Sequence, residues 1–476
     1  MPQKFVVEGV EYATLEEAQA ALSRKGPSSS ISPTSAAAAV PVAATTAVAA
    51  PQGSTPTAGS PAAASAPVQQ CGSAEPMAGP PPPVDPRTLI PALEEKLQAE
   101  VQAGQTANAA GLTSQLACIH RDLGGFDQSA SLFTQAITMF TDALGANHAA
   151  VGDTYGNLGL TYEAQGAFEE ALQSFEKAYS VHSAALGSEH RAVGETFLNM
   201  ARVYEKMQSF AAAIEMYKQA VMITAVAFGP EHPAMGDTYG NMGLAYAADE
   251  QHNRAVEAFE KSAAIHKKVL GEEHPIVAQT CINAAQSYRE LKKWNLAFDN
   301  YKLALAIRRK TCGEGHPYVA DIHGLVGDTH AEQKNYGIAL NLYNKALAIY
   351  LEKLGEGHPK VGETYGDIGN VHEAQGNFAH ALEWYDKSLS ILKPAIGEGH
   401  PMIGDLHLDK GRAWKKLGDG AQARENYRLA YEIFRTLYGD DHPDTKDAKA
   451  CMERRQDPAR QASPMRRAAS PMHQYG

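Results

Sequence analysis

The chain has 476 residues, with 42 lysines and arginines against 54 aspartates and glutamates and a formal net charge of −12. A protein with this acidic balance repels phosphate backbones, so its composition argues against a nucleic-acid-binding role. The five cysteines are widely spaced and include no CxxC pair, which argues against a disulfide framework and favours a reduced, cytosolic compartment.

Residues 1–25 predict a small ββα segment. Two short apolar runs, Phe5–Val7 and Val10–Tyr12, flank a Glu-Gly pair, as in a β-hairpin. Thr14 and Glu17 then form a capping box that opens a helix. So short a segment is a marginal fold on its own, and a weakly ordered terminus fits the same residues.

Residues 26–85 form a linker rich in proline, alanine, serine and threonine. This composition cannot bury enough apolar surface to offset the entropy of the chain, so we expect disorder. The most apolar run, Ala36–Ala50, contains a proline and is shorter than the roughly 20 residues of a membrane helix. We therefore expect no membrane insertion.

Residues 86–105 predict an amphipathic helix. Its apolar stripe consists of Leu89, Ile90, Leu93, Leu97 and Val101. We predict that this helix covers the exposed core of the first repeat in the array that follows, as helical arrays require at their ends.

A Gly-x-x-His signature recurs eight times and sets the organisation of residues 106–443. The histidines are His148, His190, His232, His274, His316, His358, His400 and His442. Each lies 42 positions from the next, with no residue inserted or lost. Every unit must therefore contact its neighbour with the same geometry.

Each unit predicts two antiparallel helices. In the unit that begins near Val151, Leu158 and Gly159 share one face of a first helix, Gly166 breaks the pattern, and Phe175 lies on the inner face of a second helix. The position of Gly159 is glycine or alanine in every unit, and that of Phe175 is phenylalanine or tyrosine. A small residue is needed where two helix axes approach to about 8–10 Å. Eight helix pairs follow.

This order of small and aromatic residues resembles the tetratricopeptide repeat. The resemblance implies an all-α fold, a right-handed superhelical solenoid of eight helix pairs with capping helices. The 42-residue unit and its LGxxHPxV spelling closely resemble the repeats of kinesin light chains and of nephrocystin-3-like proteins. Kinesin light chains carry a long heptad coiled coil before their repeats, where this sequence has a single amphipathic helix.

The C-terminal end predicts a second cap and a tail. Residues 444–457 predict a capping helix with Ala448, Cys451 and Met452 facing inward. Residues 458–476 form a basic tail that we expect to be disordered. Ser463 and Ser470 each follow an arginine by three positions and precede a proline, so both are candidate phosphorylation sites. A phosphate adds about −1.5 to −2 charges and would create or release a contact.

We expect the first helices to line the concave surface of the solenoid. One position of that helix reads Asn157, Asn199, Asn241, Asn283, Leu325, Asp367 and Asp409 in successive units. Because an amide donates and accepts together, a row of amides can hold the backbone of an extended peptide. Matching asparagines line the cargo-peptide groove of kinesin light chains, and the resemblance implies the same role here. The alternative is an asparagine ladder that bonds neighbouring helices or water.

Basic residues are expected in the same groove. Arg202, Lys206 and Arg289 should point into it and would favour an acidic peptide, and three more basic residues extend this tendency to the last unit. The last three are Arg412, Lys415 and Lys416. The alternative is a set of solvated surface charges.

Other repeated residues favour structural roles. Gly152, Gly156 and Gly159 share one helix face, which fits close packing or room for a ligand backbone. The histidines cannot share a metal, because successive units are about 8–10 Å apart and zinc ligands lie about 2.0–2.3 Å from the ion. We expect them to pack the turn before each first helix. Acidic residues that complement the helix dipole are Asp153, Glu195, Asp237, Asp321, Glu363 and Asp405.

We therefore expect a non-catalytic cytoplasmic adaptor or scaffold, without metal or cofactor, that binds linear acidic motifs of partner proteins. A kinesin heavy chain or another cytoskeletal protein is an expected partner. No unique carboxylate pair, phosphate-binding loop or nucleophile motif favours an enzyme. The alternative is a structural solenoid of a cytoskeletal or flagellar assembly that acts through its convex face or by self-association.

Overall fold

The computed structural model describes residues 5–7, 10–12, 31–33 and 86–453. The chain divides into two units, residues 1–60 and residues 61–476, which are considered separately below. The predicted phosphorylation sites Ser463 and Ser470, the linker from residue 34 to residue 85 and the basic tail lie outside the described residues.

The first unit contains a three-stranded antiparallel sheet with the order β2-β1-β3. Strand β1 (Phe5–Val7) pairs with β2 (Val10–Tyr12), with Val7 opposite Val10, and with β3 (Ile31–Pro33), with Val7 opposite Ile31. Strand β3 lies within the range that we predicted to be a disordered linker, so that prediction was wrong at these three residues. They complete the second edge of β1. The helix predicted from Thr14 lies outside the described residues, so the ββα segment stays a prediction.

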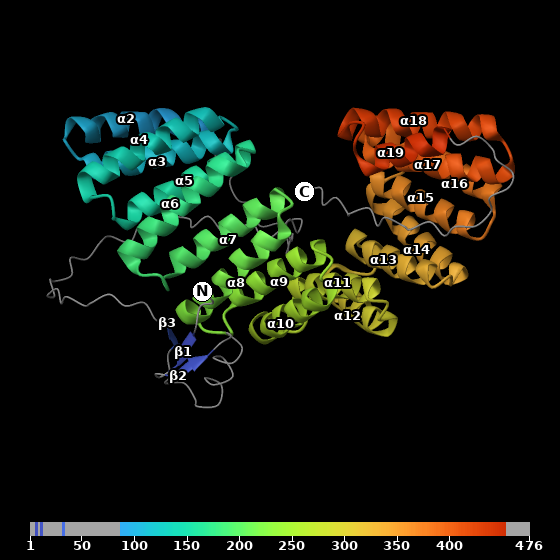
Figure 1. Ribbon diagram of the computed structural model, residues 1–476, viewed down its shortest axis with the longest axis horizontal. Helices are drawn as coiled ribbons and strands as arrows, with labels where there is room; N and C mark the ends of the chain where they lie inside the picture. The colour runs from blue at the N-terminus through green and yellow to red at the C-terminus, as the bar shows by residue number, and fades with distance from the viewer. Residues whose placement is uncertain (1–4, 8–9, 13–30, 34–85, 454–476) are drawn as a thin grey trace, which may run out of the picture. The chain divides into compact units, whose positions relative to one another are not determined.

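The second unit is a tandem array of helix pairs (Figure 1). The first helices of the eight pairs are α3 (Thr106–Asp122), α5 (Ala149–Gln165), α7 (Arg191–Lys206), α9 (Pro233–Ala248), α11 (Pro275–Glu290), α13 (Pro317–Glu332), α15 (Pro359–Ala374) and α17 (Pro401–Leu417). The second helices are α4 (Phe126–Leu144), α6 (Phe168–Leu186), α8 (Phe210–Phe228), α10 (His252–Leu270), α12 (Trp294–Cys312), α14 (Tyr336–Leu354), α16 (Phe378–Ile396) and α18 (Gly420–Tyr438). Each helix packs on its sequence neighbours, which confirms the eight predicted pairs.

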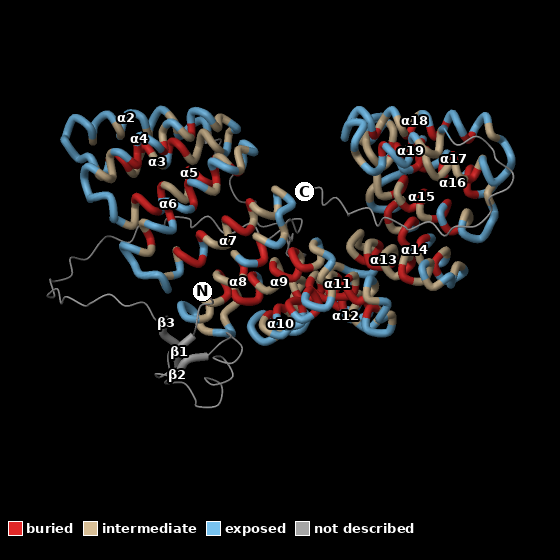
Figure 2. Tube along the Cα trace, in the orientation of Figure 1, coloured by how far each residue is buried: buried red, intermediate tan, exposed pale blue. Residues whose placement is uncertain are grey.

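The core lies between the helices of successive pairs, where the buried stretches of Figure 2 face one another. A Cβ built on Gly159 would lie 2.7 Å from the ring of Phe175, and one built on Gly411 would lie 2.5 Å from the ring of Tyr427. These distances confirm that the small residue admits the aromatic ring of its partner helix. A Cβ on Gly152 would likewise meet the ring of His182 at 2.4 Å, whereas one on Gly156 would meet nothing within 4 Å.

Seven of the eight repeated histidines cap a first helix, and His442 makes the same contact at the start of α19. His274, for example, has extended backbone angles, and its Nδ1 accepts a hydrogen bond from the backbone N–H of Ile276 at 3.3 Å. The other seven histidines accept the equivalent bond at 3.2–3.3 Å. An acceptor Nδ1 requires a neutral ring with its proton on Nε2. The expected structural role is therefore helix capping, which replaces the more usual serine or aspartate.

Two backbone positions in each repeat have positive φ. Every second helix is followed by a glycine with φ between 82° and 95°, from Gly145 to Gly439. Its ψ is extended, a combination that only glycine adopts readily. The turn between the two helices needs a left-handed residue, which is glycine in four repeats and Gln208, Glu250, Lys292 or Lys334 in the others.

Additional helices stand at the two ends of the array. A 3₁₀ turn (Pro86–Leu89) leads into α2 (Ile90–Gln102), which packs on α3. No residue of α2 is buried, and Leu89 and Val101 are exposed, so the predicted stripe covers the first repeat only in part. At the other end α19 (Pro443–Glu453) packs on α18 and buries Ala448.

Among the described helices, α8 is long and apolar enough to cross a membrane by length and composition alone. It is the second helix of the third repeat, and it packs against α7 and α9. Core helices of soluble proteins have a similar length and composition.

Candidate protein-interaction surface

The predicted asparagine row lies on the first helices, where all four amides are half-buried. Asn157 donates through Nδ2 to the backbone carbonyl of Asp153 at 3.1 Å, and Asn283 accepts from Gln279 at 3.2 Å. Asn199 and Asn241 make no hydrogen bond to any described residue. The structure thus distinguishes two amides that already form hydrogen bonds within the protein, Asn157 and Asn283, from two that can bond to a ligand, Asn199 and Asn241.

Four of the six basic residues predicted for this surface form ion pairs within the protein. Arg202 donates Nε to Oε1 of Glu163 at 2.7 Å and Nη2 to Oε2 at 2.5 Å, and Lys206 pairs with the same carboxylate at 2.9 Å. Glu163 is only 6% exposed. Burial raises the pKa of Glu163, but the hydrogen bonds and charges of Arg202 and Lys206 outweigh it and lower the pKa overall.

The same ion pair recurs at two further repeat boundaries. Arg289 lies 3.9 Å from Asp328 and 3.6 Å from Glu332 of the next first helix, and Arg412 lies 3.5 Å from Glu373 of the preceding one. Arg412 also pairs with Asp409. These residues therefore join neighbouring repeats, and their contact with an acidic peptide stays a prediction. The periodicity alone could not show that they join repeats, because the partners lie in adjacent units.

The charged side chains on the first helices of the sixth and seventh repeats are mainly acidic. Tyr350 donates to Asp321 at 2.6 Å and Tyr343 donates to Asp328 at 2.7 Å. Asp367, which replaces the asparagine of the row, accepts no hydrogen bond and forms no ion pair within the described residues. Burial, followed by the charges of Asp328 and Glu363, raises the pKa of Asp367 well above its usual range. Sequence reasoning missed the tyrosine hydroxyls because it assigned those rings to the core.

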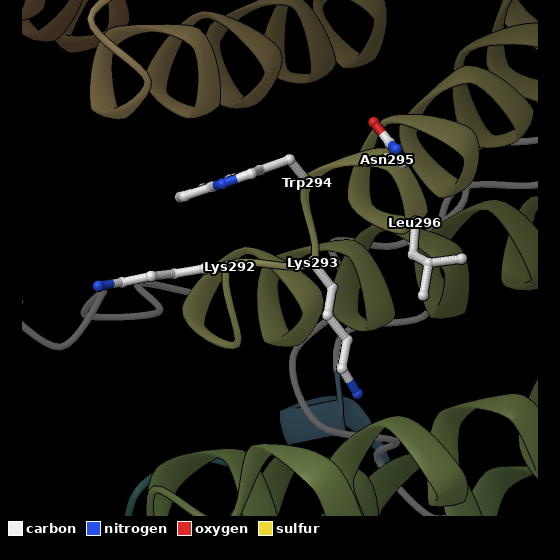
Figure 3. A pocket seen from close by; sticks show the side chains of 5 residues that line it. All are labelled: Lys292, Lys293, Trp294, Asn295 and Leu296. Atoms are coloured by element: carbon white, nitrogen blue, oxygen red, sulfur yellow. The ribbon is translucent and has the colours of Figure 1, made fainter.

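A hollow of about 310 Å³ lies at the turn between α11 and α12. It is lined by Lys292, Lys293, Trp294, Asn295 and Leu296. In Figure 3 the side chains of Lys292 and Trp294 extend alongside each other, while those of Lys293, Asn295 and Leu296 point elsewhere. Polar groups that diverge in this way do not form a small-molecule site.

The described residues contain no group of three or more His, Cys, Asp or Glu side chains that could hold a metal ion. Each capping histidine serves its own helix. The amides, carboxylates and guanidinium groups of this surface can form hydrogen bonds and ion pairs.

A continuous array of helix pairs, with polar side chains along its first helices, defines a helical-repeat protein. The tetratricopeptide repeat family model matches residues 106–184, 165–225, 192–268, 234–310, 280–352 and 318–393, and a second tetratricopeptide model matches residues 409–444. The chain belongs to the tetratricopeptide repeat family. Repeats of this family generally mediate protein–protein interactions and form a non-catalytic scaffold.

Solved structures of similar fold include BtubC (BKLC) from P. vanneervenii, at 21% identity and a TM-score of 0.43, with 48% of this chain and 91% of that chain covered. They also include the nearly identical TPR-like repeats of a Podosopora anserina protein named as a candidate kinesin light chain, at 25% identity and a TM-score of 0.39, with 44% and 98% covered. The apo form of RapI matches at 19% identity and a TM-score of 0.45, with 60% and 98% covered. The comparison with curated proteins gives no match.

Proposed function

We propose that the protein is an adaptor or scaffold that binds extended segments of partner proteins along its first helices. The observation that carries this proposal is that the side-chain amides of Asn199 and Asn241 lack hydrogen-bond partners within the described residues. They occupy equivalent positions 42 residues apart, on the first helices of adjacent repeats, and their half-buried amides bond to no described residue. A partner's backbone would supply the missing donors and acceptors.

Backbone recognition explains how such a surface would accept several sequences. An amide can accept a peptide N–H and donate to a peptide carbonyl without contacting the side chain of that residue. Gly156, beside Asn157, adds open space, because a Cβ there would meet nothing within 4 Å. The inter-repeat ion pairs hold neighbouring first helices in register, which reduces the entropy lost on binding.

The finer part of the proposal concerns the type of partner. The 42-residue period and the asparagine row support a repeat of the kinesin light chain type. We therefore propose a cytoplasmic, cytoskeleton-associated role in microtubule-motor or cytoskeletal transport, with a kinesin heavy chain among the candidate partners.

A second candidate function is a structural one, in which the second helices bind another copy or a cytoskeletal assembly. Leu296 and Ile338 support it, because they lie at equivalent positions of adjacent second helices and are 44% and 50% exposed. Exposed apolar residues that repeat along one face suit a partner that extends over several units.

Affinity purification with mass spectrometry would test the proposal, with the intact protein and an Asn199→Ala/Asn241→Ala variant as baits. We expect partners to be lost from the variant. The matched control is Asn157→Ala/Asn283→Ala, whose amides are already bonded within the protein and which should retain more of the partners. If both pairs of substitutions leave the partners unchanged, while Leu296→Lys/Ile338→Lys removes them, the structural function replaces the adaptor.

A further inference from the structure

A polar pair links the C-terminal half of the second helix to the N-terminal half of its own first helix in three repeats. His182 Nε2 lies 3.1 Å from Asp153 Oδ1, and His266 Nε2 lies 3.2 Å from Asp237 Oδ1. Tyr350 donates to Asp321 at 2.6 Å. The two partners are 29 residues apart in every case. An acidic residue on the first helix thus accepts a donor from the second.

The fifth repeat has the donor without the acid. Arg308 occupies the second-helix position, and the residue 29 positions before it is Gln279. The Gln279 amide bonds to Asn283 instead, at 3.2 Å. At the same second-helix position the third, seventh and eighth repeats carry uncharged residues, which are Thr224, Leu392 and Phe434.

Arg308 is a buried cation that forms no ion pair within the described residues. Burial raises the pKa of Asp321, and the charge of Arg308 offsets part of that rise. Arg308 is 6% exposed, its guanidinium makes no hydrogen bond or ion pair within the described residues, and Nε is buried without an acceptor. The guanidinium lies over the ring of Tyr318, 4.7 Å from the centroid. Stacking on an aromatic ring orients a guanidinium but does not satisfy its donors. Buried charges are normally paired, because an unpaired one loses its hydration without compensation.

The surroundings also favour an anion at this point. From the second repeat to the eighth, the second turn of the first helix carries an aspartate or glutamate, except in the fifth repeat, where Gln279 stands. Helix α11 therefore lacks the acidic side chain that stands at this position in the other first helices. Gln279 and Tyr318 are both half-buried, so each of these side chains reaches solvent.

We propose that Arg308 is an anion subsite of the interaction surface and takes the carboxylate of an aspartate or glutamate side chain in the bound segment. This inference rests on the proposed adaptor function and adds a residue that reads the segment's sequence. A carboxylate accepts two N–H donors of a guanidinium at once, which suits a planar cation held over Tyr318. An acidic motif is thus read by Arg308, while Arg202, Lys206 and Arg289 hold neighbouring repeats together.

The test compares fluorescein-labelled hexaglutamate amide with the matching hexaglutamine peptide by fluorescence anisotropy at low salt. We expect hexaglutamate to bind the intact protein at least about tenfold more tightly than hexaglutamine. Gln279→Glu should abolish this difference, because it supplies Arg308 with an internal carboxylate and completes the pattern of the other repeats. Arg308→Gln should abolish it by removing the cation.

Ala247→Glu is the matched control. It adds the same charge to the first helix of the fourth repeat, at a position where other repeats carry Glu163, Glu205 and Glu373. We expect this variant to keep most of the preference for hexaglutamate. The inference is overturned if hexaglutamate binds no better than hexaglutamine, or if Gln279→Glu and Ala247→Glu weaken binding equally. Gln279→Glu keeps the test decisive even if Arg308→Gln does not fold. Loss of partners from the Asn199→Ala/Asn241→Ala variant is measured separately. The adaptor function can therefore be supported even if the role of Arg308 is overturned.

Discussion

The carboxylate of Glu163 in the second repeat receives two hydrogen bonds from the guanidinium of Arg202 in the third repeat. We predict that Glu163→Gln lowers the free energy of unfolding by about 2 kcal/mol, because it removes a charge-assisted bond and leaves Arg202 without its anion. The midpoint of urea unfolding measures this effect. Glu195→Gln is the control, because its pair with Arg191 is exposed and 3.9 Å long. Such a pair contributes less than about 1 kcal/mol. Equal losses in the two variants would contradict the prediction.

The capping histidines predict that stability falls in mild acid. Burial lowers the pKa of His274 and His316 below the ordinary value of 6.5. The unfolded chain therefore binds protons first, and stability present above about pH 6.5 is lost as the pH falls toward the folded values. A protonated ring also cannot accept the N–H at Nδ1, and its charge is unfavourable at a helix N-terminus.

Thermal melting at pH 7.5 and pH 5.5 checks this prediction with two variants. His274→Ala should lose about 1 kcal/mol at pH 7.5, because the cap is missing. His274→Asn should keep the cap and become less sensitive to acid, because an amide accepts the same hydrogen bond and does not titrate. An equal acid response of the intact protein and the asparagine variant would exclude His274 as a source of the pH dependence.

The sequence predicted the helix pairs well because a 42-residue period without insertions leaves one register for every unit. It predicted the close approach of Gly159 and Phe175 because the first position is always glycine or alanine and the second is always phenylalanine or tyrosine. Relationships between units were harder to predict. Glu163 and Arg202 belong to different repeats, and neither residue is repeated at its position in every unit.

The sequence placed the asparagines on the first helices but could not show which of their amides form hydrogen bonds. The asparagine row was placed on the first helices, yet only the structure distinguishes Asn199 and Asn241 from their bonded neighbours. Arg308 was overlooked because the basic residues were sought on the first helices alone. The signal was present, since Gln279 interrupts a row of acidic residues.

The left-handed backbone angles of Lys292 and Lys334 predict that glycine at these turn positions would stabilise the protein. Both have left-handed backbone angles, with φ of 56° and 63°, at a turn position that is glycine in four other repeats. A side chain in this region costs about 1–2 kcal/mol, and the greater freedom of glycine in the unfolded chain offsets part of the gain. We therefore expect Lys292→Gly to raise the free energy of unfolding by about 0.5–1 kcal/mol in urea denaturation. Gly376→Lys, the reverse change at the equivalent turn, should lower it, and a gain in that variant would contradict the strain argument.

Gly159 and Gly156 predict opposite effects of alanine on one helix. Gly159→Ala should destabilise the protein by about 1–3 kcal/mol, because its Cβ would lie 2.7 Å from the buried ring of Phe175. Gly156→Ala should stabilise it by up to about 1 kcal/mol, because alanine favours a helix and its Cβ would meet nothing within 4 Å. Urea unfolding measures both changes. If a partner's backbone occupies the space beside Asn157, the more stable Gly156→Ala protein should also recover fewer partners in affinity purification. If the Gly156→Ala variant recovers as many partners as the intact protein, no partner backbone lies beside Gly156, and the amides of Asn199 and Asn241 remain the proposed binding determinants.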